Sequence, residues 1–145
     1  MSPQQMTAGA QTVTQVTVKI NGGDVTVDEG DTILTACTQA GIETPTICYA
    51  ENLTPVNACR VCVVEVEGNR TLVPSCSRPA EEGMVISTDS DRVKHSRKMV
   101  LEFLGTANDL SEAPQINEWS TEYGVDITRY ADGAERFDQP VKIQD

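Results

Sequence analysis

Residues 13–41 have the sequence VTQVTVKINGGDVTVDEGDTILTACTQAG, and this stretch contains the main signals for the fold. Apolar residues occupy alternate positions from 16 to 20 and again at 25 and 27, which is typical of strands with one buried face. Asn21-Gly22-Gly23 lies between the two runs, and these residue types tolerate the positive φ angles of a tight hairpin turn. The stretch therefore predicts a β-hairpin.

A helix is predicted directly after the hairpin. Asp31 is placed to cap it, Ile33, Leu34 and Cys37 recur at helical spacing, and Gly41 can end it. Two strands followed by a helix point toward a β-grasp arrangement, in which a helix packs across a mixed sheet. Periodicity alone leaves that choice open.

The next segment combines a loop with short strands. Residues 42–60 contain two prolines and two asparagines, so an irregular loop is expected there. Residues 61–67, 71–75 and 84–88 are predicted strands, because they are short, rich in valine and separated by turn residues. The cysteines of this segment then fall on the loop and on the edges of the strands beside it.

A helical segment is predicted from residue 90 onward. Val93, Val100, Leu101 and Leu104 share one helical face, and Gly105 can stop that helix. Residues 113–123 predict another short helix, and 124–145 an irregular ending. Residues 1–12 are polar and predict a disordered tail. The expected organisation is thus a tail at 1–12, a domain at 13–89 and a helical segment at 90–145.

Composition limits the functional classes. The chain carries 22 acidic and 11 basic residues, a formal charge of −11, so it would repel nucleic acid. The acidic surface favours basic docking patches, or it simply keeps the protein soluble. No apolar run is long enough for a membrane span, and the first residues do not resemble a signal peptide. These features predict a cytoplasmic protein without membrane insertion.

The five cysteines point to a metal centre. An odd number in a chain without an export signal argues for reduced thiols rather than disulfides. Four of them follow the pattern Cys48-x10-Cys59-x2-Cys62-x13-Cys76. A [2Fe–2S] cluster needs four thiolates, two on each iron, whereas structural zinc most often takes two close cysteine pairs. The spacing favours the cluster and leaves zinc open, and the plant ferredoxin pattern C-x4-C-x2-C is absent.

Several motifs give the chain a specific resemblance. They are PTICY at 45–49, CRVCVVE at 59–65, PSC at 74–76 and GMVIST at 83–88. With these motifs, residues 13–104 resemble the N-terminal [2Fe–2S] domain of the complex I large subunit and of the electron-transfer subunits of NAD-linked hydrogenases and formate dehydrogenases. The resemblance implies an α+β, β-grasp ferredoxin-like fold followed by a short helical segment. It also implies one [2Fe–2S] cluster on Cys48, Cys59, Cys62 and Cys76.

The chain departs from that family in two places. Asn57 stands where the family usually has glycine, and asparagine is one of the few other residues that enter the left-handed region readily. The family also follows this domain with a [4Fe–4S] cluster on one histidine and three cysteines, but residues 105–130 contain neither residue type. We therefore expect that the second cluster is lost and its helices remain as packing. We also expect a longer parent subunit.

The resemblance predicts one-electron transfer within a multi-subunit NAD(P)-linked oxidoreductase. The implied partners are a flavin- or NAD(P)-binding subunit and a catalytic metal subunit. A free ferredoxin shuttle and a zinc-stabilised interaction module are the alternatives. No nucleotide-binding motif or catalytic pair is present, so this chain is expected to have no catalytic site of its own. Four thiolates in an acidic protein predict a potential of roughly −400 to −200 mV.

The remaining conspicuous residues have structural interpretations. Cys37 is predicted to lie in the core, His95 on a solvated helix face, and Trp119 as the anchor of the last helix. Met84 is expected to cover the core or the cluster.

The basic residues around His95 are expected to form a polar face, with docking to an acidic neighbour as the alternative. These residues are Arg92, Lys94, Arg97 and Lys98. Arg60 is predicted either to steady the reduced cluster or to form an outward salt bridge with Glu65.

Overall fold

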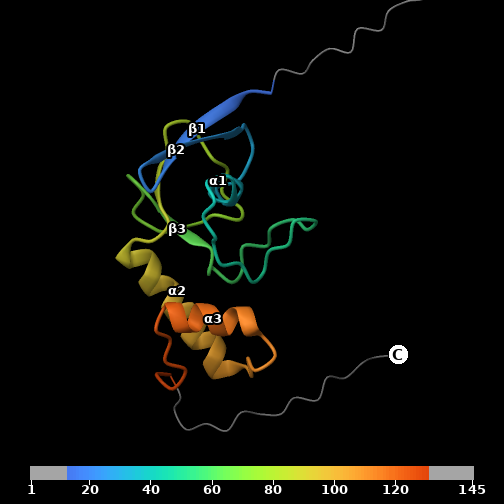
Figure 1. Ribbon diagram of the computed structural model, residues 1–145, viewed down its shortest axis with the longest axis vertical. Coiled ribbons are helices and arrows are strands. Elements are labelled where there is room, and N and C mark those ends of the chain that lie inside the picture. The colour runs from blue at the N-terminus through green and yellow to red at the C-terminus, as the bar shows by residue number, and fades with distance from the viewer. Residues whose placement is uncertain (1–12, 131–145) are drawn as a thin grey trace, which may run out of the picture.

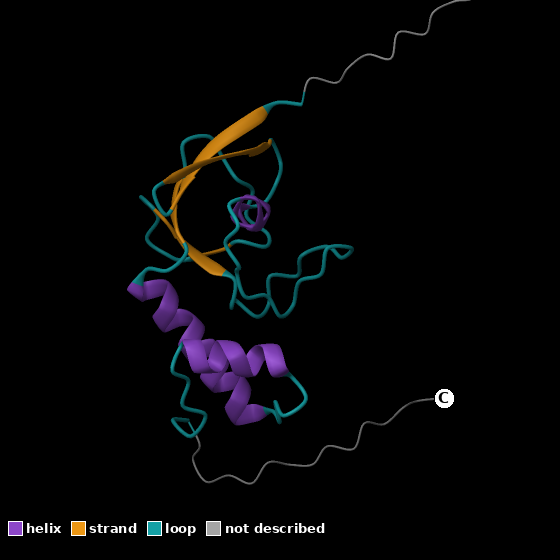
Figure 2. Cartoon of the chain, in the orientation of Figure 1, coloured by secondary structure: helices purple, strands orange, loops and turns teal. Residues whose placement is uncertain are grey.

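The computed structural model describes residues 13–130. The predicted tail at 1–12 and the last fifteen positions, 131–145, lie outside the described residues. A curved sheet wraps around one short helix, and two further helices lie together below that unit (Figures 1 and 2). The loop that carries the first two cysteines of the predicted site lies between these two parts.

The predicted hairpin is confirmed. Strand β1 (Gln15–Ile20) pairs antiparallel with β2 (Gly23–Asp28). Between them, Asn21 has φ 49° and Gly22 has φ 88°, the two positive angles that a type I′ turn requires. The alternation seen in the sequence places Val18 and Ile20 in the core and their neighbours at the surface.

The sheet has five strands in the order β2-β1-β5-β3-β4. Strand β3 spans Val63–Val66, β4 spans Val73–Pro74 and β5 spans Val85–Ser87. The pairing of β1 with β5 is parallel and the other three pairings are antiparallel. This mixed sheet with a helix packed against it confirms the predicted α+β class.

Helix α1 (Ile33–Gln39) lies across the sheet and closes the main core. The prediction that Asp31 caps it is wrong, because Thr32 is the N-cap and its hydroxyl accepts a 3.2 Å hydrogen bond from the Thr35 amide. The Asp31 carboxylate instead accepts a bond from the Asp28 amide and so closes the turn before the helix. Gly41, with φ 71°, follows the helix end as predicted.

Helix α2 spans Asp91–Ala107 and α3 spans Pro114–Glu122. The prediction that Gly105 stops the first of these helices is wrong, because α2 continues to Ala107. Gly105 instead allows Ile127 to pack closely against α2. A Cβ at this position would lie 2.5 Å from the Cγ2 atom of Ile127, so only glycine lets the segment after α3 cross so closely.

A second apolar cluster joins the helices to the sheet unit. Val61, Leu101 and Trp119 are buried together, which confirms Trp119 as the anchor of α3. Glu102 is also fully buried, and Arg129 forms a 3.3 Å ion pair with it. Position 102 carries a charged residue on the inner side of α2, which apolar periodicity could not predict.

The predicted polar face of α2 is wrong at one position. His95 is exposed as expected, but Arg97 is buried at 4% exposure. Glu65 forms its salt bridge with Arg92, at 2.5 Å, and not with Arg60. Arg60 is exposed and has a left-handed backbone, with φ 61°.

Between residues 13 and 130, no helix is both long and apolar enough to cross a bilayer.

Candidate metal centre

Two of the four predicted ligands are brought together by the β3–β4 hairpin. Cys62 directly precedes β3 and Cys76 follows two residues after β4. Between the strands, the Ser75 amide donates a 3.3 Å hydrogen bond to the Cys62 carbonyl, and the Ser75 hydroxyl donates one of 2.7 Å to the same oxygen. Cys62 and Cys76 consequently lie together in one small buried cluster.

The other two predicted ligands meet across the long loop. The Cys59 amide donates a hydrogen bond to the Cys48 sulfur at 3.5 Å. Asn57, with φ 54°, and Arg60, with φ 61°, lie on either side of Cys59 and turn the chain sharply. Asn57 thus adopts the left-handed conformation, which asparagine enters more readily than most residues.

The two pairs differ in burial. Cys62 and Cys76, which we call the inner pair, are each 1% exposed and pack with Leu34 and the ring of Tyr49. Cys48 and Cys59, the outer pair, are half-buried. A centre held by all four sulfurs would therefore have one dry side and one side close to the surface.

The electrostatics of the thiols follow from this burial. The hydrogen bond from the Cys59 amide lowers the pKa of Cys48, because it stabilises the thiolate. Burial raises the pKa of Cys76 to about 12, and the adjacent Cys62 sulfur adds to this effect. A buried thiolate at Cys76 thus needs a compensating positive charge, which a coordinated metal supplies in place of the proton.

The donor set fits a two-iron cluster. Within residues 13–130, no three His, Cys, Asp or Glu side chains converge on one metal ion. The thiols form two pairs, Cys48 with Cys59 and Cys62 with Cys76. The outer pair also contributes to the raised pKa of Cys76. All the donors are sulfur, an amide already points at one of them, and each pair can serve one iron of a [2Fe–2S] cluster.

The fifth cysteine stands apart from this arrangement. Cys37 is 0% exposed and packs in the main core against the sheet, as predicted. Burial raises its pKa, which is typical of an inert structural thiol. Met84 also packs against this main core.

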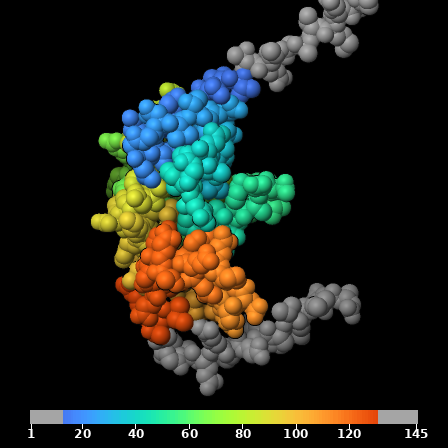
Figure 3. All heavy atoms as spheres, viewed as in Figure 1, coloured from blue at the N-terminus to red at the C-terminus, as the bar shows by residue number. Residues whose placement is uncertain are grey.

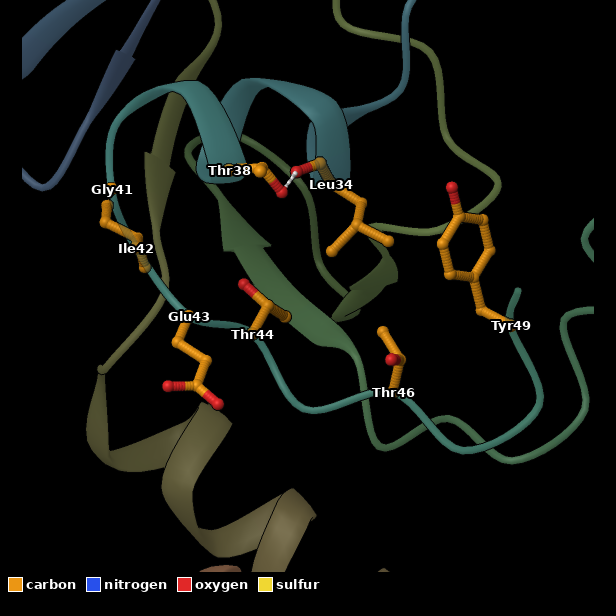
Figure 4. A pocket seen from close by; sticks show the side chains of 8 residues that line it. All are labelled: Leu34, Thr38, Gly41, Ile42, Glu43, Thr44, Thr46 and Tyr49. Atoms are coloured by element: carbon orange, nitrogen blue, oxygen red, sulfur yellow. Dashed lines mark hydrogen bonds between the residues drawn. The ribbon is translucent and has the colours of Figure 1, made fainter. Parts of the chain in front are cut away.

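Two residues of the site were not predicted from the sequence. Ser75 supports the inner pair through its two bonds to Cys62, and Tyr49 covers that pair. Tyr49 faces Leu34 across a groove of about 360 Å³ between α1 and the loop (Figure 4). The only sequence signal for either residue was its position next to a predicted ligand.

A mixed sheet around one helix, with four cysteines gathered beside its edge, defines a ferredoxin-like domain. Residues 13–91 match the family model described as a 2Fe-2S iron-sulfur cluster binding domain. The match covers more than half of the chain, and the chain belongs to this family. The predicted kind of cofactor, a [2Fe–2S] cluster, is thereby confirmed.

Curated relatives carry this domain at a fraction of their length. The chain is 45% identical over 89 residues to an NADH-quinone oxidoreductase subunit of Rickettsia felis, covering 61% of this chain and 13% of the relative. It is 46% identical over 97 residues to an NADP-reducing hydrogenase subunit of Solidesulfovibrio fructosivorans, covering 63% and 17%. A mitochondrial NADH-ubiquinone oxidoreductase 78 kDa subunit from Candida albicans is 33% identical over 137 residues, covering 89% and 19%.

A solved structure shares the fold. It is a crystal structure of NAD+-reducing [NiFe]-hydrogenase in the H2-reduced state, with a TM-score of 0.68 and 22% identity. The alignment covers 88% of this chain and 55% of the hydrogenase chain, so it extends beyond the cysteine-bearing domain. The predicted resemblance to complex I and NAD-linked hydrogenase subunits is confirmed.

Proposed function

We propose that Cys48, Cys59, Cys62 and Cys76 hold one [2Fe–2S] cluster, and that the chain passes single electrons within a multi-subunit NAD(P)-linked oxidoreductase. The observation that carries the proposal is the arrangement of the four thiols in two adjacent pairs. Such pairs suit two bridged irons, and membership of the cluster-binding family supports the same cofactor.

When bound, the cluster supplies reversible one-electron chemistry. The inner pair, with Leu34 and Tyr49, excludes water from one side. The Cys59 amide donates to a ligand sulfur and so stabilises negative charge there. The net charge of −11 works in the other direction and disfavours an added electron. Of these two effects, the acidic charge is the one that supports the predicted low potential.

The host complex is inferred from the relatives. Their names describe NADH-quinone oxidoreductase and NADP-reducing hydrogenase subunits, and the chain spans about an eighth to a fifth of their length. We infer partners of two kinds, a flavin- or NAD(P)-binding subunit and a catalytic metal subunit, in the cytoplasm. Two predictions remain untested: a formate dehydrogenase as the host enzyme, and a boundary between the domain and the helical segment at residues 89 and 90.

The helical segment supports a module rather than a free shuttle. Val61, which lies between the ligands Cys59 and Cys62 in the chain, is buried with Leu101 and Trp119, so α2 and α3 are packed directly beneath the site. A small diffusing ferredoxin does not need this second layer. The gel-filtration behaviour of the native material separates the two, because a module elutes with other subunits and a shuttle elutes alone.

The test is metal analysis and spectroscopy of anaerobically prepared protein. About two irons per chain, visible absorption and one rhombic paramagnetic resonance signal after reduction are expected. Replacing any one of the four ligands by alanine should abolish this signal. Cys37→Ala is the matched control and should retain it. A colourless protein containing one zinc would contradict the proposal.

A further inference from the structure

Exposed apolar side chains are concentrated on the loop that bears the outer pair. Ile47 is 37% exposed, Leu53 is 68% exposed and Val56 is 67% exposed. Within residues 13–130, the other large hydrophobics that are comparably exposed lie singly along the rest of the chain: Val13, Val85, Phe103 and Ile127. Grouped exposed apolar side chains on a soluble domain mark an interaction site, whereas single ones are ordinary.

The shape of this loop suits docking. Residues 47–56, which we call the ridge, stand out from the body of the molecule with a hollow on either side (Figure 3). One hollow is the groove beside α1, which Tyr49 lines. The other is a cavity of about 370 Å³ between the loop and α3, lined by Ile47, Ile116 and Trp119 among others. A partner can therefore contact the ridge and both hollows at once.

The charge around the ridge is mainly acidic, and the exposed Arg60 beside Cys59 is a cation next to it. Residues 42–58 and 108–123, which form the loop and the α3 region, contain no lysine, arginine or histidine. Their ionisable side chains with a formal charge at neutral pH are all acidic: Glu43, Glu51, Asp109, Glu112, Glu118 and Glu122. An apolar centre with an acidic rim complements an apolar protein surface bordered by lysine and arginine.

We propose that the ridge and its two hollows are the docking surface for a redox partner protein whose contact face is apolar with a basic rim. This inference rests on the proposed function. Cys48 lies on the ridge, and Cys59 follows it closely in the chain and is half-buried. Electron transfer falls off steeply with distance, so a partner seated on the ridge lies on the shortest route to the outer pair. The acidic rim steers such a partner toward it.

The binding test uses the full chain with its cluster and zinc-substituted cytochrome c. That probe is a small protein with an apolar porphyrin edge surrounded by lysines, and its zinc porphyrin cannot accept the electron. Isothermal titration calorimetry at low ionic strength gives the dissociation constant. Leu53→Ser and Val56→Ser should each weaken binding by about three- to tenfold. Glu51→Gln should weaken it at low salt, and the difference should shrink at high salt.

Matched controls lie away from the ridge. Val13→Ser removes an apolar side chain that is 56% exposed, and Glu29→Gln removes an exposed carboxylate near the first hairpin. Both controls should bind the probe as the unchanged chain does. Ridge variants that bind as tightly as these controls overturn the docking surface.

A kinetic arm uses native cytochrome c and ferricyanide as oxidants of the reduced chain. In each reaction one electron leaves the chain and one ferric iron becomes ferrous, with no bond or proton exchanged. The ridge variants should slow the reaction with cytochrome c by the factor seen in binding, and leave the reaction with the small anion unchanged. Equal slowing with both oxidants would show altered cluster access and overturn the docking surface.

The two proposals fail in different ways. Protein that lacks iron and colour overturns the proposed function, and the docking surface with it. Ridge variants with an unchanged visible spectrum and unchanged binding overturn the docking surface alone.

Discussion

The guanidinium of Arg97 donates a 3.0 Å hydrogen bond to the backbone carbonyl of Val63, the residue that follows the inner-pair cysteine Cys62. The second terminal nitrogen of the guanidinium donates a 2.9 Å hydrogen bond to the Tyr123 hydroxyl, and the Cζ atom lies 5.8 Å from the centre of the Tyr123 ring. Within residues 13–130, no carboxylate forms an ion pair with Arg97. This arginine therefore joins the helical segment to the strand that carries the site.

Replacing Arg97 by methionine should lower the free energy of unfolding by about 2–3 kcal/mol, because a buried carbonyl and a hydroxyl lose a charged donor. Thermal or denaturant unfolding of the full chain measures the change. Arg92→Met is the control, since its partner Glu65 is partly exposed and surface pairs contribute about 0–1 kcal/mol. Equal losses in the two variants would contradict the bridging role of Arg97.

Gly105→Ala tests the crossing of α2 with the segment after α3. Alanine stabilises a helix interior by about 1 kcal/mol relative to glycine, but its Cβ would lie 2.5 Å from the Cγ2 atom of Ile127. We expect a net loss of stability in the single variant. The double variant Gly105→Ala/Ile127→Ala should recover much of that loss, because the contact is removed. A single variant that is more stable than the unchanged chain would refute the close packing.

Asn57→Gly should be tolerated or should raise stability by about 0.5–1 kcal/mol, because glycine adopts the φ of 54° without the steric cost of a side chain. The change also removes the buried Asn57 Oδ1 atom, which has no hydrogen-bond partner in the structure. Asn57→Val should reduce the iron content, since a β-branched residue resists this conformation. Iron analysis and thermal unfolding check both variants. Full iron loading of the valine variant would contradict the idea that the cluster site needs a left-handed backbone at residue 57.

The contact of Glu65 with the start of α2 predicts a pH-dependent stability. Hydrogen bonds from the Ser90 hydroxyl and from Arg92 lower the pKa of the Glu65 carboxyl. A lowered folded-state pKa means that the stabilisation is complete above the unfolded value, near 4.5, and is lost as the pH falls through the folded value. The melting temperature of Glu65→Gln should therefore lie below that of the unchanged chain at pH 7, and the gap should close in acid.

The same comparison in an Arg92→Met background provides the control. There the gap at pH 7 should be smaller, because one of the two groups that stabilise the carboxylate is gone. A gap that widens in acid would reverse the sign of the predicted linkage.

Much of the domain is encoded in local sequence. The alternation around residue 18, the turn at Asn21 and Gly22, and the apolar spacing of α1 each predicted the correct element. The errors fell on element ends, at Asp31 and Gly105. The reason is that several neighbouring residues are able to cap or end a helix, and packing selects among them.

The sequence by itself determined the hairpin, the first helix and the cysteine spacing, because strand alternation, turn conformation and helical periodicity depend on neighbouring residues. Only the tertiary structure decided that Cys62 meets Cys76 and Cys48 meets Cys59. It also decided that β1 pairs with β5, and that Arg97 and Glu102 lie inside. These features depend on which distant segments become neighbours, and burial of a charge becomes favourable only when those segments supply its partners.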